Sequence, residues 1–250
     1  MKEKLYTIPL NEAMDANDEC PLCVVKRNVE QDLLDYCLGP GASYMESDTR
    51  DDTDKEGFCR EHFKKMFDYG NALGNAWILK THYKRTIEEM DRAVSRFSAP
   101  AGKKLFSRSE AGSDSVSRWI NEREQSCYIC RRMEDTYERY LDTFFVLYKK
   151  DDAFRDKVKN SKGFCLPHFK DVVKKAADSL DDKEKGSFYD TVFDVMKKNM
   201  ERISNDVAWF VEKFDYRNAD EPWKDSKDAI QRGMQKLAGG FPADPVYKNN

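Results

Sequence analysis

The cysteines and histidines of this chain fall into two similar sets. In each set a C-x-x-C pair is followed by a G-F-C-x-x-H-F motif, with 35 residues between the second and third cysteines in the first set and 34 in the second. The first set is Cys20, Cys23, Cys59 and His62, and the second is Cys127, Cys130, Cys165 and His168. Together they use six of the seven cysteines and two of the three histidines. This repetition predicts an internal duplication.

Three cysteines and one histidine are a standard ligand set for a structural zinc ion, which binds four protein ligands tetrahedrally. Two cysteines separated by two residues can reach one ion from a tight turn. Cys59 and His62, at positions i and i+3, are neighbours on a helix. Gly57 and Gly163 precede these helical turns at positions where a positive φ is often required. The sequence therefore predicts two zinc ions per chain, each bound by the four ligands of its own half.

Other chemistries use the same ligands. Disulfides are disfavoured, because a reducing cytosol keeps thiols free and because cystines would leave the matched histidines unexplained. A thioredoxin-like C-x-x-C would require a βαβ context, which the sequence does not show. Iron–sulfur clusters on these ligands remain an alternative. A thiol-based metal or redox sensor, in which Cys23 or Cys130 reacts once metal is lost, is another.

The ligand count favours a binding protein over an enzyme. A catalytic zinc normally keeps one position open for water or substrate, whereas each set here fills all four. The chain also has no Gly-rich phosphate loop, no G-x-S-x-G and no H-E-x-x-H. We therefore assign no catalytic residue. The sequence favours a metal-stabilised module that binds or scaffolds a partner protein or a small molecule.

Charge and hydropathy exclude several classes. The 250 residues include 43 Lys and Arg against 46 Asp and Glu, a formal net charge of -3 that argues against nucleic-acid binding. The longest apolar run, 144–148, is far shorter than the roughly 18 residues of a membrane helix, and no secretory signal is visible. A cytoplasmic location is therefore expected.

The pattern of apolar residues predicts an all-α fold. Glycine (12) and proline (8) are scarce, and apolar residues recur at helical spacing. Helices are expected at about 11–17, 22–38, 59–69, 75–97, 114–123, 131–149, 166–178 and 187–214. Residues 5–10 are expected to be extended, and 41–56 and 150–162 to be connections. In the helix at 75–97 the expected inward residues are Ile78, Tyr83, Ile87, Met90 and Val94.

These elements suggest a helical bundle of two tandem metal-stapled repeats. The first repeat covers 1–97 and the second 114–215. A Ser-, Gly- and Ala-rich linker at 98–113 joins them, and 216–250 form a C-terminal extension. We expect Trp223 of this extension to pack against the bundle, with a binding surface as the alternative.

The two remaining candidate ligands have simpler explanations. Cys37 continues the apolar stripe of the helix at 22–38 and is expected to be a small buried hydrophobe. His82 has no Cys or His partner at ligand spacing, so it is expected to pack or lie at the surface.

The chain resembles an uncharacterised bacterial family with duplicated C-P-x-C and G-F-C-x-x-H-F motifs. The likeness extends to Lys213-Phe-Asp-Tyr-Arg217 and to Pro222-Trp223 with the Ser226-Lys-Asp-Ala229 that follows. It implies an anaerobe-associated bacterial origin and a cytoplasmic protein, but no activity. The second C-x-x-C begins Cys127-Tyr128 where the family has Cys-Pro, which leaves the ligands intact.

Overall fold

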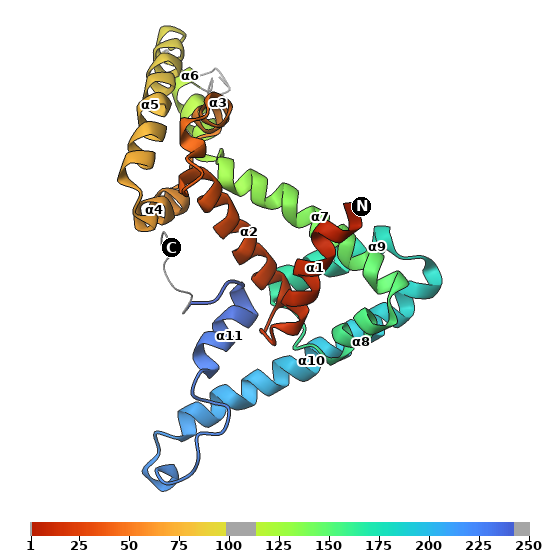
Figure 1. Ribbon diagram of the computed structural model, residues 1–250. Helices are drawn as coiled ribbons and strands as arrows, with labels where there is room; N and C mark the ends of the chain where they lie inside the picture. The colour runs from red at the N-terminus through yellow and green to blue at the C-terminus, as the bar shows by residue number, and fades with distance from the viewer. Residues whose placement is uncertain (1, 99–113, 243–250) are drawn as a thin grey trace, which may run out of the picture. The chain divides into compact units, whose positions relative to one another are not determined.

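The computed structural model describes residues 2–98 and 114–242, and the regular elements among these residues are all helices, joined by turns and short loops (Figure 1). The predicted all-α class is confirmed. The predicted linker at 98–113 lies, apart from its first residue, outside the described residues. The helices are α1 (Lys2–Asp15), α2 (Pro21–Leu38), α3 (Ser47–Glu56), α4 (Arg60–Tyr69), α5 (Ala72–Ser95), α6 (Ser115–Glu124), α7 (Tyr128–Lys150), α8 (Asp152–Asn160), α9 (Leu166–Ser179), α10 (Asp182–Glu212) and α11 (Ala229–Ala238), with short 3₁₀ turns η1 (Ser43–Met45) and η2 (Tyr216–Asn218).

The described chain divides into two compact units. Unit 1 combines residues 2–29 with 135–242, and unit 2 combines 30–98 with 114–134. The divisions fall inside α2 and α7, so each of these helices contributes to both units. The units do not coincide with the expected repeats at 1–97 and 114–215, because the first 29 residues group with the second repeat.

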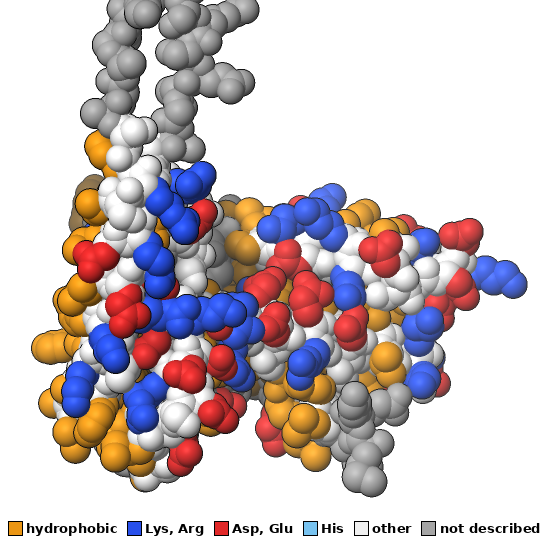
Figure 2. All heavy atoms as spheres, turned by 90° about the horizontal axis from the view of Figure 1, so that it is seen from above, with side chains coloured by type: hydrophobic (Ala, Val, Ile, Leu, Met, Phe, Trp, Pro, Cys, Tyr) orange, Lys and Arg blue, Asp and Glu red, His pale blue; other side chains and the backbone are white. Residues whose placement is uncertain are grey.

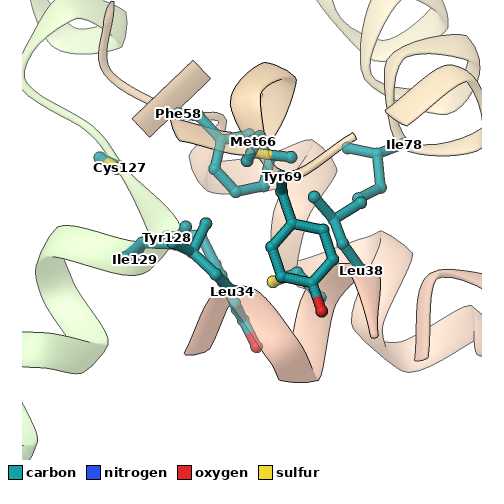
Figure 3. Close-up of a cluster of buried hydrophobic side chains, with 10 residues drawn as sticks. Leu34, Leu38, Phe58, Met66, Tyr69, Ile78, Cys127, Tyr128 and Ile129 are labelled. Atoms are coloured by element: carbon teal, nitrogen blue, oxygen red, sulfur yellow. The ribbon is translucent and has the colours of Figure 1, made fainter. Parts of the chain in front are cut away.

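Unit 2 is built around a small apolar core that joins α2, α4, α5 and the start of α7 (Figure 3). The core side chains are Leu34, Cys37, Leu38, Phe58, Met66, Tyr69, Ile78, Cys127, Tyr128 and Ile129. Cys37 is fully buried, as expected for a small hydrophobe, and burial raises its pKa to about 12. One metal-ligand candidate, Cys127, belongs to this core, so metal binding and core packing are linked in unit 2.

The expected connection at 41–56 is wrong, because most of it forms η1 and α3. Helix α3 packs on α5 through a polar face, where Thr49, Thr53 and Asp54 are buried. Thr81 of α5 donates a hydrogen bond to Asp54 Oδ1 at 2.8 Å. The sequence prediction relied on apolar periodicity, and a helix that buries threonine and aspartate lacks that signal.

The expected orientation of α5 is also mostly wrong. Ile78 is buried, but Tyr83, Ile87, Met90 and Val94 are 41–63% exposed. The opposite side of α5 contacts α3 and α6. These helices cover that side of α5, and the face that was expected to point inward is left exposed.

Unit 1 has an aromatic core from α7, α8, α10 and the segment before α9, in which Phe188 of α10 lies 5.4 Å from Phe145. Phe144 lies in edge contact with Phe145, Phe154 and Phe164, at centroid distances of 5.2, 5.3 and 5.9 Å. Residues 5–10, expected to be extended, lie within α1, and 152–160, expected to be a connection, form α8. Both short helices contact each other, and α8 also contacts α10. Helix α1 contains an internal proline, Pro9, and α8 buries only Phe154 and Val158, so neither segment showed a clear helical pattern in the sequence.

The C-terminal extension folds back onto unit 1, where α11 contacts α10 and α9. Trp223 packs against Phe210 and Phe214 at centroid distances of 5.6 and 6.3 Å, and Lys213 Nζ lies 5.4 Å from its ring. These contacts show that Trp223 packs on the end of α10. On the face shown in Figure 2, basic and acidic side chains are interspersed, in line with the near-balanced charge.

Candidate metal centres

The structure brings all eight candidate ligands into two tight clusters, but not in the expected pairing. Centre 1 consists of Cys20, Cys23, Cys165 and His168, and centre 2 of Cys59, His62, Cys127 and Cys130. Each C-x-x-C pair therefore meets the C-x-x-H motif of the other half. The expectation that each half closes its own site is wrong. Because the two motifs of each kind are nearly identical, their spacing allows both pairings and cannot choose between them.

In centre 1 the three sulfurs surround the Nδ1 atom of His168. The Sγ atoms of Cys20, Cys23 and Cys165 lie 3.3, 3.5 and 3.2 Å from it. The sulfurs of Cys23 and Cys165 are 3.7 Å apart. All four residues are buried. Four donor atoms at these separations enclose a space that one ion would fill.

Centre 2 has almost the same geometry around His62 Nδ1. The Sγ atoms of Cys59, Cys127 and Cys130 lie 3.2, 3.3 and 3.3 Å from it, and those of Cys59 and Cys130 are 3.8 Å apart. In contrast to centre 1, Cys130 is exposed and Cys59 is half-buried. Centre 2 is therefore open to solvent on the side of these two sulfurs.

Helix starts position the ligands of both centres. Cys59 and Cys165 are the N-cap residues of α4 and α9, with φ of -71° and -72°, and each histidine follows in the first helical turn. The C-x-x-C pairs lie at the starts of α2 and α7. Backbone N–H groups and the positive end of the helix dipole favour thiolate over thiol at such positions.

A glycine two residues before each N-cap cysteine is required by the backbone. Gly57 and Gly163 have φ of 65° and 75°, a region that disfavours side chains, so the expectation of positive φ is confirmed. A Cβ on Gly57 would lie 2.8 Å from His82 Cε1, and one on Gly163 would lie 2.9 Å from Met196 Sδ. These glycines allow the chain to turn closely into the ligand helix.

The ligand histidine of centre 2 is held by a buried carboxylate. His62 Nε2 lies 3.0 Å from Glu30 Oε1, and Lys65 Nζ donates to the same oxygen at 2.6 Å. A carboxylate on the far nitrogen fixes the tautomer and the ring orientation of a metal-binding histidine. Sequence reasoning missed Glu30, because nothing in its surroundings distinguishes it from the other acidic residues of α2.

A buried ionic network supports the C-x-x-C turn of centre 1. Glu19, which directly precedes Cys20, pairs with Arg202 at 2.6 Å and with Lys236 at 3.3 Å. Lys236 Nζ also donates to the Glu19 carbonyl oxygen at 2.7 Å. Glu19 and Lys236 are both almost completely buried. The end of α11 is thus anchored to the turn that carries the first two ligands.

The residue after α11 lies directly over the sulfurs of centre 1. A Cβ on Gly239 would lie 3.4 Å from Cys165 Sγ and 4.0 Å from Cys23 Sγ. The C-terminal extension therefore helps to cover this centre. The sequence offered no signal for this contact, which joins residues more than 200 positions apart in the case of Cys23.

Hydrogen bonding within each cluster favours one ionised thiol. Hydrogen bonds from Cys20 and Cys23 lower the pKa of the Cys165 thiol. Burial acts to raise the pKa of Cys127, but hydrogen bonds from His62 and from backbone N–H groups outweigh it and lower this pKa. Burial raises the pKa of Cys20. A bound cation would supply the charge needed to ionise the remaining thiols.

A cavity of about 600 Å³ adjoins centre 2 and is lined by Cys59, His82, Trp119 and Arg123 among others. His82 belongs to neither cluster. Its Nδ1 lies 3.2 Å from the Asp54 carbonyl oxygen, and burial lowers its pKa. The expectation that His82 is a packing histidine agrees with this position.

The fold and these clusters define a class: an all-α protein with two Cys₃His clusters suited to binding metal ions. The chain belongs to a family of unknown function, DUF6062, whose model matches residues 1–244. Membership in an uncharacterised family, inferred from the duplicated motifs, is thereby confirmed. Searches of curated proteins and of solved structures found no match to the chain. Within the described residues, no helix has the length and apolarity needed to cross a membrane.

Proposed function

We propose that the protein binds two zinc ions, one in each Cys₃His cluster, and that these ions hold its helices together. With zinc–sulfur bonds of about 2.3 Å and zinc–nitrogen bonds of about 2.0–2.1 Å, tetrahedral zinc would place two sulfurs about 3.8 Å apart and a sulfur and a nitrogen about 3.6 Å apart. In the structure the separations are 3.7 and 3.8 Å between sulfurs, and 3.2–3.5 Å between sulfur and nitrogen, within about 0.4 Å of the tetrahedral value. This agreement carries the proposal.

The same distances weigh against iron–sulfur clusters on these ligands. A cluster distributes its protein ligands over two or more irons, which separates the ligand atoms more widely than a single ion does. In both centres all four ligand atoms lie within 4.8 Å of one another. A mononuclear site fits this spacing.

Zinc binding of the usual strength would also determine whether each unit stays folded. Structural zinc in small peptides contributes about 10–16 kcal/mol of apparent binding free energy. A typical domain is stable by only about 5–15 kcal/mol, so loss of either ion would threaten the unit that contains it. With four protein ligands on each ion, no position remains for substrate, which supports a non-catalytic role.

We further propose that this zinc-stabilised framework acts as a cytoplasmic binding or scaffold module for a protein or a small molecule. Thiolate ligands require a reducing environment, which the cytoplasm provides. The cavity beside centre 2 offers space for a small ligand. The near-balanced charge gives no support to nucleic acid as the partner.

Elemental analysis of protein purified without oxygen tests the metal proposal. We expect about two zinc ions per chain and a colourless protein. The variant Cys37→Ala, which removes a buried cysteine outside both clusters, should retain both ions. A brown protein containing iron and inorganic sulfide would contradict the proposal, as would a chain without metal.

A second candidate function is a thiol-based sensor confined to centre 2, and the exposure of Cys130 favours it. A hydroperoxide could accept two electrons from the thiolates of Cys59 and Cys130 and two protons from solvent; its O–O bond would break to give water and an alcohol. The two sulfurs would form a disulfide, and the zinc ion would leave. Mass spectrometry after peroxide treatment should then find a disulfide among the centre 2 cysteines while those of centre 1 remain bound; equal oxidation of both centres would contradict this role.

A further inference from the structure

Helix α5 carries an exposed apolar stripe along most of its length. The positions of the stripe are Leu73, Ala76, Lys80, Tyr83, Ile87, Met90, Val94 and Phe97, the last of which follows the end of the helix. Their spacing alternates strictly between three and four residues. All eight are exposed, and the six large apolar side chains among them are 41–63% exposed.

The rest of α5 is anchored within unit 2, so the stripe is a distinct face. The helix contacts α3, α4 and α6. On the packed side Ile78 and Ala93 are buried, and Trp119 Nε1 of α6 donates to Glu89 Oε2 at 3.3 Å. The unit therefore fixes this helix in place and presents one regular apolar face outward.

This spacing is that of a coiled-coil seam. Apolar residues that alternate at intervals of three and four keep facing a partner helix as the two helices wind around each other. The five large side chains from Tyr83 to Phe97 offer about 100 Å² each, so pairing this part of two copies would bury about 1,000 Å² in total, close to the minimum expected of a specific interface. An exposed apolar face of about 500 Å² is near the upper end of what monomers carry, and such faces often mark interaction sites.

The charges that flank the stripe select one arrangement. Lys84 and Asp91 are exposed and occupy equivalent flanking positions one heptad apart. In an antiparallel pair that places Ile87 opposite Met90 of the second copy, each Lys84 lies beside the second copy's Asp91. Two-fold symmetry produces this opposite-charge pair twice. A parallel pair would instead set these charges beside the uncharged Leu79 and Thr86.

We propose that two copies of the chain associate through an antiparallel pairing of their α5 helices, centred between Ile87 and Met90. The interface is isologous, because the same stripe serves both copies. Lys80 lies opposite Phe97 of the second copy in this register, where its ammonium group can rest on the ring. This assembly does not depend on the identity of the metal in either centre.

Sedimentation analysis of the full chain over a range of concentrations tests the dimer. We expect a dimer for the natural chain, and a monomer for Ile87→Glu because the variant buries two unpaired charges at the centre of the seam. The dissociation constant should rise about 100-fold or more. Val211→Glu, which adds the same charge at an exposed apolar position of α10, is the matched control and should stay dimeric.

Helix content by circular dichroism and metal content should be unchanged in Ile87→Glu, because Ile87 is 51% exposed and is not among the buried residues of the unit 2 core. A natural chain that is monomeric throughout, whether because another part of the chain or a different protein covers the stripe, would overturn the proposal. So would a dimer that Ile87→Glu leaves intact.

Charge exchange tests the register. Lys84→Asp and Asp91→Lys should each weaken the dimer, by about threefold to tenfold, because like charges then face each other twice. The double variant Lys84→Asp/Asp91→Lys should restore the original affinity. If the double variant instead loses as much dimer affinity as the two single variants lose together, the antiparallel register is wrong.

Discussion

Glu30 Oε1 lies 3.0 Å from Nε2 of His62, while the Nδ1 atom of the same ring faces three sulfurs. The carboxylate thus holds the imidazole in the tautomer that leaves a lone pair on Nδ1 for a cation. Lys65 holds Glu30 in turn. Lys65, Glu30 and His62 thus form a chain of hydrogen bonds that fixes the orientation of the imidazole ring.

We predict that Glu30→Gln weakens zinc binding at centre 2 by about 10–100-fold, because supporting carboxylates contribute about this much to metal affinity. Competition with a chromophoric chelator would measure the loss. Glu61→Gln is the matched control, since Glu61 contacts Lys65 at 3.0 Å and is exposed. If both variants bind zinc equally well, the carboxylate does not support the histidine.

The crossed pairing of the motifs gives a second prediction. Loss of one ligand in Cys165→Ser should release the metal of centre 1 and expose Cys20 and Cys23 to alkylation. Cys127 should remain protected, because its partners are Cys59 and His62. Differential alkylation followed by mass spectrometry measures this directly. A tandem pairing would give the opposite pattern, with the Cys127 pair labelled and the Cys20 pair protected.

These pairings show which part of the metal centres could be predicted from the sequence and which could not. The eight ligand candidates could be identified from residue type and local spacing, because ligation imposes both within a few residues. Their partners could not, because Cys59 and Cys165 stand in equivalent motifs and either could serve Cys20. Only the three-dimensional arrangement of the helices distinguishes the two solutions.

The same limit applies to the helices. Amphipathic periodicity located α2, α4, α7 and α9 closely, since each buries an apolar face in the core. It missed α3, whose buried face is polar. It also assigned the apolar stripe of α5 to the interior, because periodicity reports that a face is apolar and not what covers it.

We predict that the two ions leave at different rates. Cys130 and Cys59 of centre 2 are accessible to solvent, whereas all four ligands of centre 1 are buried. A chelator should therefore remove one ion per chain in a fast phase and the second much more slowly. Following zinc release together with thiol labelling would assign the fast phase to Cys130. A single phase that accounts for both ions would show that burial does not control release.

Acid should release both ions, because protons compete with zinc for the thiolates and the imidazole. We expect apparent zinc affinity to fall as the pH is lowered and helix content to fall with it. Circular dichroism at fixed total zinc, repeated at a tenfold higher zinc concentration, measures the linkage. The midpoint should shift to lower pH with more zinc, and an unchanged midpoint would mean that the fold is lost independently of the metal.

The buried Lys236 gives the last prediction, because it connects the C-terminal extension to centre 1. Its Nζ donates to the carbonyl oxygens of Glu19 and Lys162 and pairs with the Glu19 carboxylate. Lys236→Met would keep the length of the side chain but leave these buried acceptors without a donor, at a cost of about 3–5 kcal/mol. Thermal unfolding should show this loss, and zinc should leave centre 1 faster, since Gly239 no longer stays over its sulfurs. The exposed Lys227→Met serves as the control and should change neither. If Lys236→Met released zinc only from centre 2, the extension would not protect the centre it covers.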